Sequence, residues 1–127
     1  MIRWLERKKV FSIILFILIA AEIFFFSSIS GPKLALEGVL DPSIAYHFCV
    51  FFLLNFFLLI SINGNKGLKL KYIIISFFFS IVYSILDEVH QLFVPFRSPS
   101  FSDILTDSVG IFSSILLYLH SKKSRKP

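Results

Sequence analysis

Four long apolar stretches, separated by short polar segments, dominate the chain. They run over residues 10–29, 43–62, 72–94 and 104–119. Their lengths are close to the roughly 20 residues that an α-helix needs to cross the hydrocarbon core of a bilayer. The pattern therefore predicts an all-α fold, an integral membrane bundle of four transmembrane helices that forms a single domain over residues 1–127.

The composition of the chain supports a membrane environment. Hydrophobic residues make up 56% of the sequence, including 17 Phe, against about 45–50% apolar residues in soluble domains. The 13 Lys and Arg and the 8 Asp and Glu cannot cover so much apolar surface in a soluble monomer of this length. We therefore expect a multi-pass protein of the cell membrane whose partners include membrane lipid.

The net charge of +5 comes from basic clusters that lie outside the apolar stretches. These clusters precede the first stretch, separate the second from the third, and follow the fourth: Arg3, Arg7, Lys8, Lys9, Lys66, Lys69, Lys71, Lys122, Lys123, Arg125 and Lys126. The two remaining connections carry one cation each, Lys33 and Arg97. By the positive-inside rule, both termini and the 63–71 turn are predicted to be cytoplasmic. The same distribution gives no reason to expect a nucleic-acid partner.

An alternative for the first stretch is a cleaved signal peptide. Small residues with cleavage-site spacing, Ser28-Ile29-Ser30, precede Gly31 after a basic start. The apolar run is longer than a usual signal-peptide core, and Glu22 inside it is unusual for one. Cleavage would leave the orientation of the other three spans unchanged.

Ionisable residues interrupt the third predicted span near its C-terminal end. The segment Asp87-Glu88-Val89-His90-Gln91 lies between Leu86 and a further apolar triplet. Charged groups in the hydrocarbon cost about 2.5–3.5 kcal/mol each at the centre on insertion scales, and less near the interface. These side chains therefore need partners or a function. They extend a stripe that begins with Ser76 and Ser80 on the same face of the helix.

The fourth predicted span carries a matching stripe. Asp103, Asp107, Gly110 and Ser114 follow one another at spacings of four, three and four residues, which places them on one face of a helix. The two stripes can face each other across a short connection that contains Arg97. Ser102 is the residue that we expect to cap the fourth helix.

Polar residues of the first two spans fall at the same predicted level of the membrane. Glu22 lies past the middle of the first span, and His47 lies near the start of the second. All four helices would then contribute polar groups to one region of the outer leaflet, which we interpret as a site. Asn55 is expected to link helices by hydrogen bonds, and Tyr118 to anchor its helix at the membrane interface.

Several of these segments together resemble a known family. They are Phe26-Ser27-Ser28, His47-Phe48, the run from Asp87 to Pro95, Arg97, Ser102-Asp103 and Gly110. Over about residues 11–120 the chain is similar to the VanZ-like family of small bacterial membrane proteins. It departs from the family pattern at Asp107, where Asn is usual, and at Ile44, where Lys is usual. The resemblance implies a multi-span integral membrane protein, and the founding member of the family is linked to low-level resistance to the glycopeptide teicoplanin.

The residue types of the predicted site suit more than one function. As an enzyme, the protein would use Asp87 or Glu88 with His90 for proton transfer at a lipid-linked or cell-envelope substrate. Arg97 would bind an anionic group of that substrate. The remaining candidates for substrate binding are His47, Gln91, Asp103, Asp107 and Glu22.

Three alternatives to an enzyme stay open from the sequence. A binding or accessory protein would use the same pocket without turnover. A structural role would reduce the charges to a network that packs helices, and an oligomeric transporter would need several copies of this chain. Neither the number of copies nor the chemical identity of the substrate follows from the sequence.

No metal or cofactor is expected from the sequence. The chain has one Cys and no repeated His spacing of the kind that marks metal sites. Glu88, His90 and Asp103 nevertheless include the ligand types that suit a divalent metal.

The predicted orientation can be tested with reporter fusions. A reporter fused at Lys126 is expected to be active only in its cytoplasmic form, because the basic clusters hold that end inside. A reporter inserted between Gly31 and Asp41 is expected to show the opposite activity. An external signal from the fusion at Lys126 would contradict the prediction.

Overall fold

The computed structural model of the chain describes residues 2–30, 42–64 and 68–124. These ranges contain helices and no strand: α1 (Ile2–Arg7), α2 (Lys9–Ser28), α3 (Pro42–Asn63), α4 (Leu70–Gln91) and α5 (Phe101–Lys123). The helices α2 to α5 are each long and apolar enough to cross a membrane. The prediction of an all-α bundle with four membrane-spanning helices is confirmed. Lys33, Lys66, Arg125 and Lys126 lie outside the described residues.

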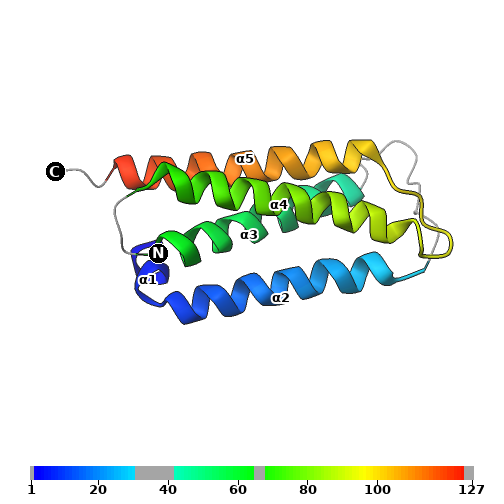
Figure 1. Cartoon of the computed structure of the whole chain (residues 1–127), viewed down its shortest axis with the longest axis horizontal. Helices are drawn as coiled ribbons and strands as arrows, with labels where there is room; N and C mark the ends of the chain where they lie inside the picture. Colours follow the sequence, from blue (N-terminus) through cyan, green and yellow to red (C-terminus); the bar gives the residue numbers. More distant parts are fainter. Residues whose placement is uncertain (1, 31–41, 65–67, 125–127) are drawn as a thin grey trace.

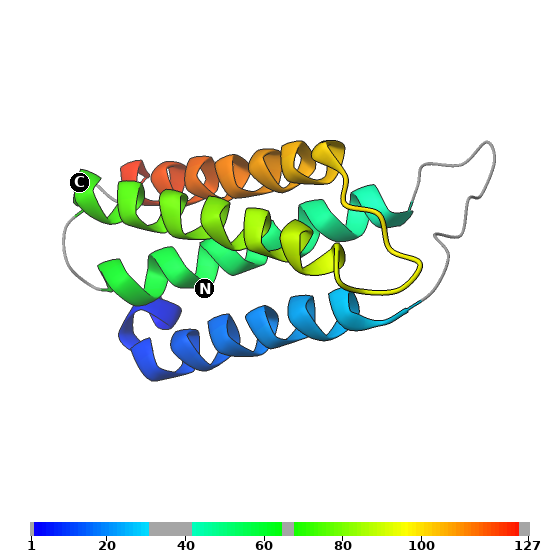
Figure 2. The ribbon, with the colours of Figure 1, turned by 45° about the vertical axis from the view of Figure 1, so that its right-hand side comes forward.

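The four long helices lie side by side, and α3 packs against α2, α4 and α5 (Figures 1 and 2). Helix α1 and the C-terminal end of α5 lie at one end of the bundle, and the connection between α4 and α5 lies at the other (Figure 1). All the basic clusters of the described residues are therefore at the first end, which we call the basic end. The opposite end, which we call the acidic end, holds Asp87, Glu88, Asp103 and Asp107. Which end faces the cytoplasm stays a prediction.

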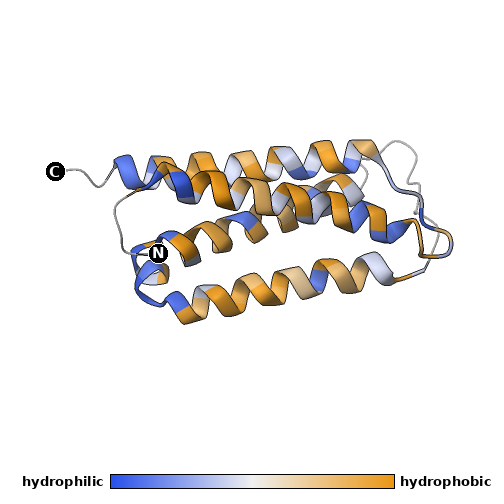
Figure 3. Ribbon diagram, in the orientation of Figure 1, coloured by the Kyte–Doolittle hydropathy of each residue, from blue (hydrophilic) through white to orange (hydrophobic). Residues whose placement is uncertain are grey.

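The helices turn apolar side chains outward and polar side chains inward. Hydrophobic positions cover the middle of the helices, and hydrophilic positions gather toward their ends (Figure 3). Phe78, on the outer face of α4, is 63% exposed, whereas Ser80, two positions along the same helix, is fully buried. Because lipid is an apolar solvent, this arrangement favours a bilayer over water. The predicted polar stripes of α4 and α5 are both buried, as expected.

Helices α3 and α5 approach each other closely at Gly110. A Cβ atom at this position would lie 2.5 Å from the carbonyl oxygen of Phe48 and 3.1 Å from the amide nitrogen of Phe52. One turn further toward the basic end, Asn55 Nδ2 donates a hydrogen bond to Ser114 Oγ at 2.7 Å, and Asn55 Oδ1 accepts one from Ser80 Oγ at 3.1 Å. Asn55 thus links α3, α4 and α5, which confirms its predicted role.

A second polar cluster closes the basic end. Glu6 of α1 is buried and accepts hydrogen bonds from Lys122 Nζ at 2.6 Å and from Tyr118 OH at 2.9 Å. Asn63, the last residue of α3, donates to Tyr118 OH at 2.7 Å. The prediction that Tyr118 anchors the helix at the membrane interface is wrong, because its ring is fully buried and its hydroxyl joins three helices.

The ends of the helices at the acidic end also differ from the prediction. Helix α4 ends at Gln91 and not at residue 94, because the residue before Pro95 is disfavoured in helical conformation. Helix α5 begins at Phe101, and its N-cap residue is Ser100 and not Ser102. The carbonyl oxygen of Ser100 accepts the first hydrogen bond of the helix, from the amide of Asp103 at 3.1 Å.

Replacing Gly110 by Ala is expected to lower the melting temperature of the purified protein in detergent. The new methyl group would collide with backbone atoms of α3, so the two helices must separate, at a cost of about 1–3 kcal/mol. Val109→Ala, on the exposed face of α5, is the control and is expected to melt near the wild-type temperature. Equal melting temperatures of Gly110→Ala and wild type would show that the stability of the bundle does not depend on this close approach.

Candidate functional site

The centre of the acidic end is a buried pair between α3 and α5. His47 Nδ1 lies 3.0 Å from Asp107 Oδ1, and Ser84 Oγ of α4 donates to Asp107 Oδ2 at 2.6 Å. An ionised carboxylate can only accept, so this contact places the proton of the neutral imidazole on Nδ1. The other ring nitrogen, Nε2, is then left for a different partner.

Two further carboxylates lie near His47. Asp103 Oδ2 is 3.7 Å from His47 Nε2, beyond hydrogen-bond distance. Glu88 Oε2 accepts a hydrogen bond from the amide nitrogen of Ser100 at 2.7 Å. One ligand atom from each of His47, Glu88 and Asp103 lies within 4.8 Å of the other two, and all three side chains are buried. The acidic end thus brings an imidazole and two carboxylates together.

A cavity of about 510 Å³ opens beside this cluster, between α2, α3 and α4. Its apolar lining includes Ile23 and Phe26 of α2. Its charged and polar lining includes Glu22, Tyr46, His47, Asp87, Gln91 and Arg97. Four of the residues predicted to bind substrate therefore line the same cavity: Glu22, His47, Gln91 and Arg97. Asp103 and Asp107 are not part of its lining and lie next to His47.

Buried polar atoms of the cavity lining lack a hydrogen-bond partner in the described part of the chain. They include Gln91 Oε1 and Tyr46 OH. Gln91 Nε2 donates to Asp87 Oδ2 and to Glu88 Oε1, each at 3.3 Å, and these two acceptors fix the orientation of the amide. A buried polar atom without a partner costs about 1–3 kcal/mol. The cavity therefore offers unused hydrogen-bonding capacity to whatever enters it.

Arg97 lies on the cavity wall but does not pair with a carboxylate of the described residues. Its Nη2 donates to the carbonyl oxygen of Phe26 at 2.7 Å, and its Nε donates to that of Ile29 at 3.1 Å. These carbonyls belong to the C-terminal end of α2, where a cation is favoured by the helix dipole. Arg97 therefore holds the end of α2 while it remains half-buried beside the cavity.

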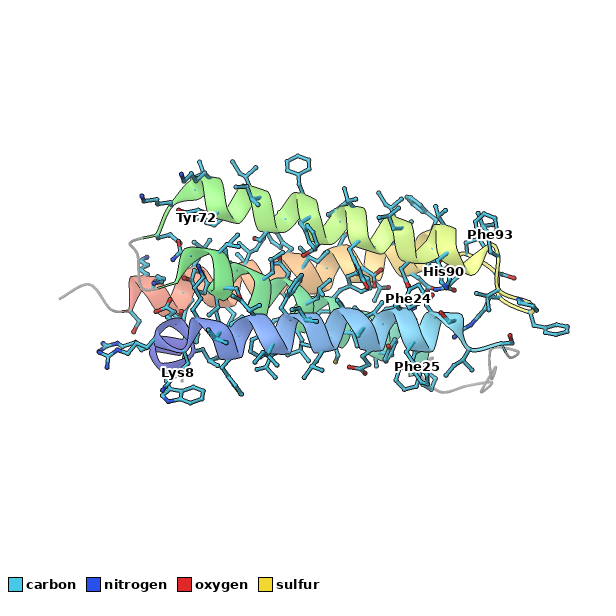
Figure 4. All side chains as sticks on the ribbon, turned by 60° about the horizontal axis from the view of Figure 1, so that its bottom comes forward. Lys8, Phe24, Phe25, Tyr72, His90 and Phe93 are labelled. Atoms are coloured by element: carbon cyan, nitrogen blue, oxygen red, sulfur yellow. The ribbon has the colours of Figure 1, made fainter. Side chains whose placement is uncertain are left out.

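His90 turns away from the carboxylate cluster toward α2. Its Nε2 lies 3.0 Å from Ser28 Oγ, and its ring centroid lies 4.8 Å from that of Phe24 (Figure 4). A smaller cavity of about 150 Å³ is lined by both of these rings and by Asp87. A catalytic role for Asp87, Glu88 and His90 stays a prediction. The histidine that directly contacts carboxylates is His47.

Three residues of the site had no assigned role in the sequence analysis. Ser84 extends the serine stripe of α4, so its position on the buried face was visible in the helical spacing. The position of Tyr46 in the cavity could not be predicted from the sequence, because an aromatic residue in an apolar span normally packs against other side chains. Ser100 contributes a backbone amide, which no side-chain pattern can reveal.

The fold and the site define a four-helix membrane protein with a buried histidine–carboxylate cluster beside a partly polar cavity. The chain belongs to the VanZ/LLP1 family, whose model matches residues 10–122. The family suggested by the sequence resemblance is thereby confirmed. Neither a curated protein nor a solved structure matches the chain.

The Asp107 contacts predict different outcomes for two substitutions of similar size. Asp107→Asn keeps an oxygen to accept from His47 and is expected to melt close to wild type. Asp107→Leu leaves the buried groups of His47 and Ser84 without their partner and is expected to cost about 1–3 kcal/mol for each. Thermal melting in detergent checks both variants. Equal melting of the two would mean that this pair does not stabilise the bundle.

Proposed function

We propose that this VanZ/LLP1 protein binds the headgroup of a membrane amphiphile, a lipid or a lipid-linked envelope molecule, in the 510 Å³ cavity. The observation that carries the proposal is the combination of an apolar wall with buried polar atoms that have no hydrogen-bond partner among the described residues, such as Gln91 Oε1 and Tyr46 OH. Small-molecule sites are typically apolar cavities of about 300–1,000 Å³ with a few placed polar groups. A bilayer lipid can reach such a cavity without crossing water.

The cavity lining restricts the chemistry of the headgroup. Arg97 has donors beyond the two that bind the end of α2, and these suit a phosphate or carboxylate oxygen. Tyr46 OH can donate or accept, and Gln91 Oε1 accepts from a hydroxyl or an amine. Asp87 and Glu22 add negative charge to the same wall. The preferred ligand therefore combines an anionic group with hydroxyl or amine groups.

Binding without turnover is sufficient for this proposal. A protein that holds envelope amphiphiles at the outer membrane surface would alter how lipid-targeted glycopeptides reach their targets. This fits the teicoplanin resistance that the family resemblance suggests. Because the cavity lies at the acidic end, the proposal requires that end to face outward, as the positive-inside rule predicts.

The proposal predicts that Tyr46→Phe weakens ligand binding and leaves stability unchanged. Its hydroxyl has no hydrogen-bond partner to lose among the residues that the structure describes, whereas a hydrogen bond to a ligand contributes about 0.5–1.5 kcal/mol, or roughly two- to tenfold in affinity. The measurement is native mass spectrometry of protein released from nanodiscs that contain phosphatidylglycerol, phosphatidylethanolamine and a polyprenyl phosphate. Wild type is expected to retain one of these lipids preferentially, and the variant to retain less of it.

Tyr118→Phe is the matched control at the other end of the bundle. Its hydroxyl contacts Glu6 and Asn63, so this variant should melt earlier and retain lipid as wild type does. The proposal fails if wild type shows no lipid preference, or if the two Tyr→Phe variants retain lipid equally.

A further inference from the structure

We infer that the acidic end holds a divalent transition-metal ion, with His47 Nε2 and carboxylate oxygens of Glu88 and Asp103 as its ligands. The distance of 3.7 Å between His47 Nε2 and Asp103 Oδ2 is too long for a hydrogen bond. It is shorter than twice a metal–ligand distance of about 2.1 Å. One ion between the two atoms can therefore contact both. Glu88 belongs to the same group, because one ligand atom from each of His47, Glu88 and Asp103 lies within 4.8 Å of the other two.

His47 is already oriented as metal-binding histidines are. Such residues donate their second ring N–H to a carboxylate, which fixes the ring and directs the other nitrogen at the metal. Here Asp107 accepts at 3.0 Å from Nδ1, and Ser84 in turn donates to Asp107 at 2.6 Å. Asp107 is therefore a positioning residue for His47 and not a ligand.

The acidic end concentrates carboxylates around the proposed ligands. Asp87, Glu88, Asp103 and Asp107 are each at least 92% buried. Buried carboxylates must carry protons, pair with cations or bind a metal. A divalent ion held by Glu88 and Asp103 is therefore stabilised by the negative charge around it.

An independent observation at the same place is the unpartnered oxygen of Gln91. This side chain is 98% buried and its amide nitrogen contacts Glu88, yet its Oε1 has no partner among the described residues. A water molecule bound to the ion can donate to this oxygen. Because Gln91 and His47 both line the 510 Å³ cavity, an ion and its water have an entry path.

The ligand types indicate which ion the site prefers. One imidazole and two carboxylates suit Mn²⁺, Fe²⁺ or Zn²⁺ better than Ca²⁺, whose sites consist of oxygen ligands alone. This set differs from the one that the sequence suggested, because His47 takes the place of His90. The inference does not depend on the proposed binding of an amphiphile.

The test is a titration of the purified full-length chain with Mn²⁺ in detergent micelles without added lipid, after treatment with a chelator. Free Mn²⁺ is measured by its electron paramagnetic resonance signal. Wild type is expected to bind one ion per chain, to release it on addition of Zn²⁺, and to melt at a higher temperature with the ion bound. Absence of saturable binding by wild type overturns the inference and leaves the lipid measurements unaffected.

Variants locate the ion. Asp103→Asn and Glu88→Gln keep side-chain size, and each is expected to weaken Mn²⁺ binding by at least tenfold. Glu22→Gln is the matched control, because this carboxylate lines the cavity outside the three-ligand group. The affinity of this variant for Mn²⁺ should stay within twofold of wild type. Asp107→Asn keeps an acceptor for His47, so its affinity for Mn²⁺ should stay within about threefold of wild type.

Melting of each variant without metal separates loss of the site from loss of the fold. Binding that survives in both Asp103→Asn and Glu88→Gln overturns the assignment of ligands. The assignment is also overturned if Glu22→Gln weakens Mn²⁺ binding as much as Asp103→Asn and Glu88→Gln do.

Discussion

The close contact between α3 and α5 aligns the polar contacts that run along the two helices. Gly110 lets the backbones meet near Phe48. With that contact fixed, His47 meets Asp107 on its acidic side, Asn55 meets Ser114 on its basic side, and Asn63 meets Tyr118 at the basic end. The three polar residues of α3 are eight residues apart, so they follow the four-residue ridge of the helix along the contact. The histidine–carboxylate pair is therefore a consequence of helix packing.

The bilayer explains why these pairs are buried. Lipid offers no hydrogen bonds, so each polar side chain in a spanning helix must find a partner inside the bundle. Asn55 meets this requirement with two serine hydroxyls, and Glu6 with Lys122 and Tyr118. The acidic end satisfies it only in part, since Gln91 Oε1 and Tyr46 OH have no hydrogen-bond partner within the described ranges. The lipid site and the metal site are both inferred at this end of the bundle.

The sequence predicted the fold and much of the site because helical spacing is visible in the residues. The stripes through Ser80 and Asp107 identified the buried faces of α4 and α5, and hydropathy identified the spans. Spacing along one helix cannot tell which neighbour a side chain will meet. His90 was therefore grouped with Asp87 on its own helix, although it contacts Ser28 of α2. The sequence placed His47 at the same level of the membrane as Asp103 and Asp107, but it did not show which histidine would contact these carboxylates.

Helix α2 shows how a cavity can persist in a bundle of this size. The other long helices are more deeply buried than α2, which is held to its neighbours by hydrogen bonds at separate points. Tyr83 OH donates to the carbonyl oxygen of Ala20 at 2.7 Å, and His90 and Arg97 contact its last turn. These polar contacts fix the position of α2 without requiring side chains to fill the space that it encloses with α3. Arg97, which attaches the last turn of α2, also lines the cavity, so the attachment of this helix and the cavity share a residue.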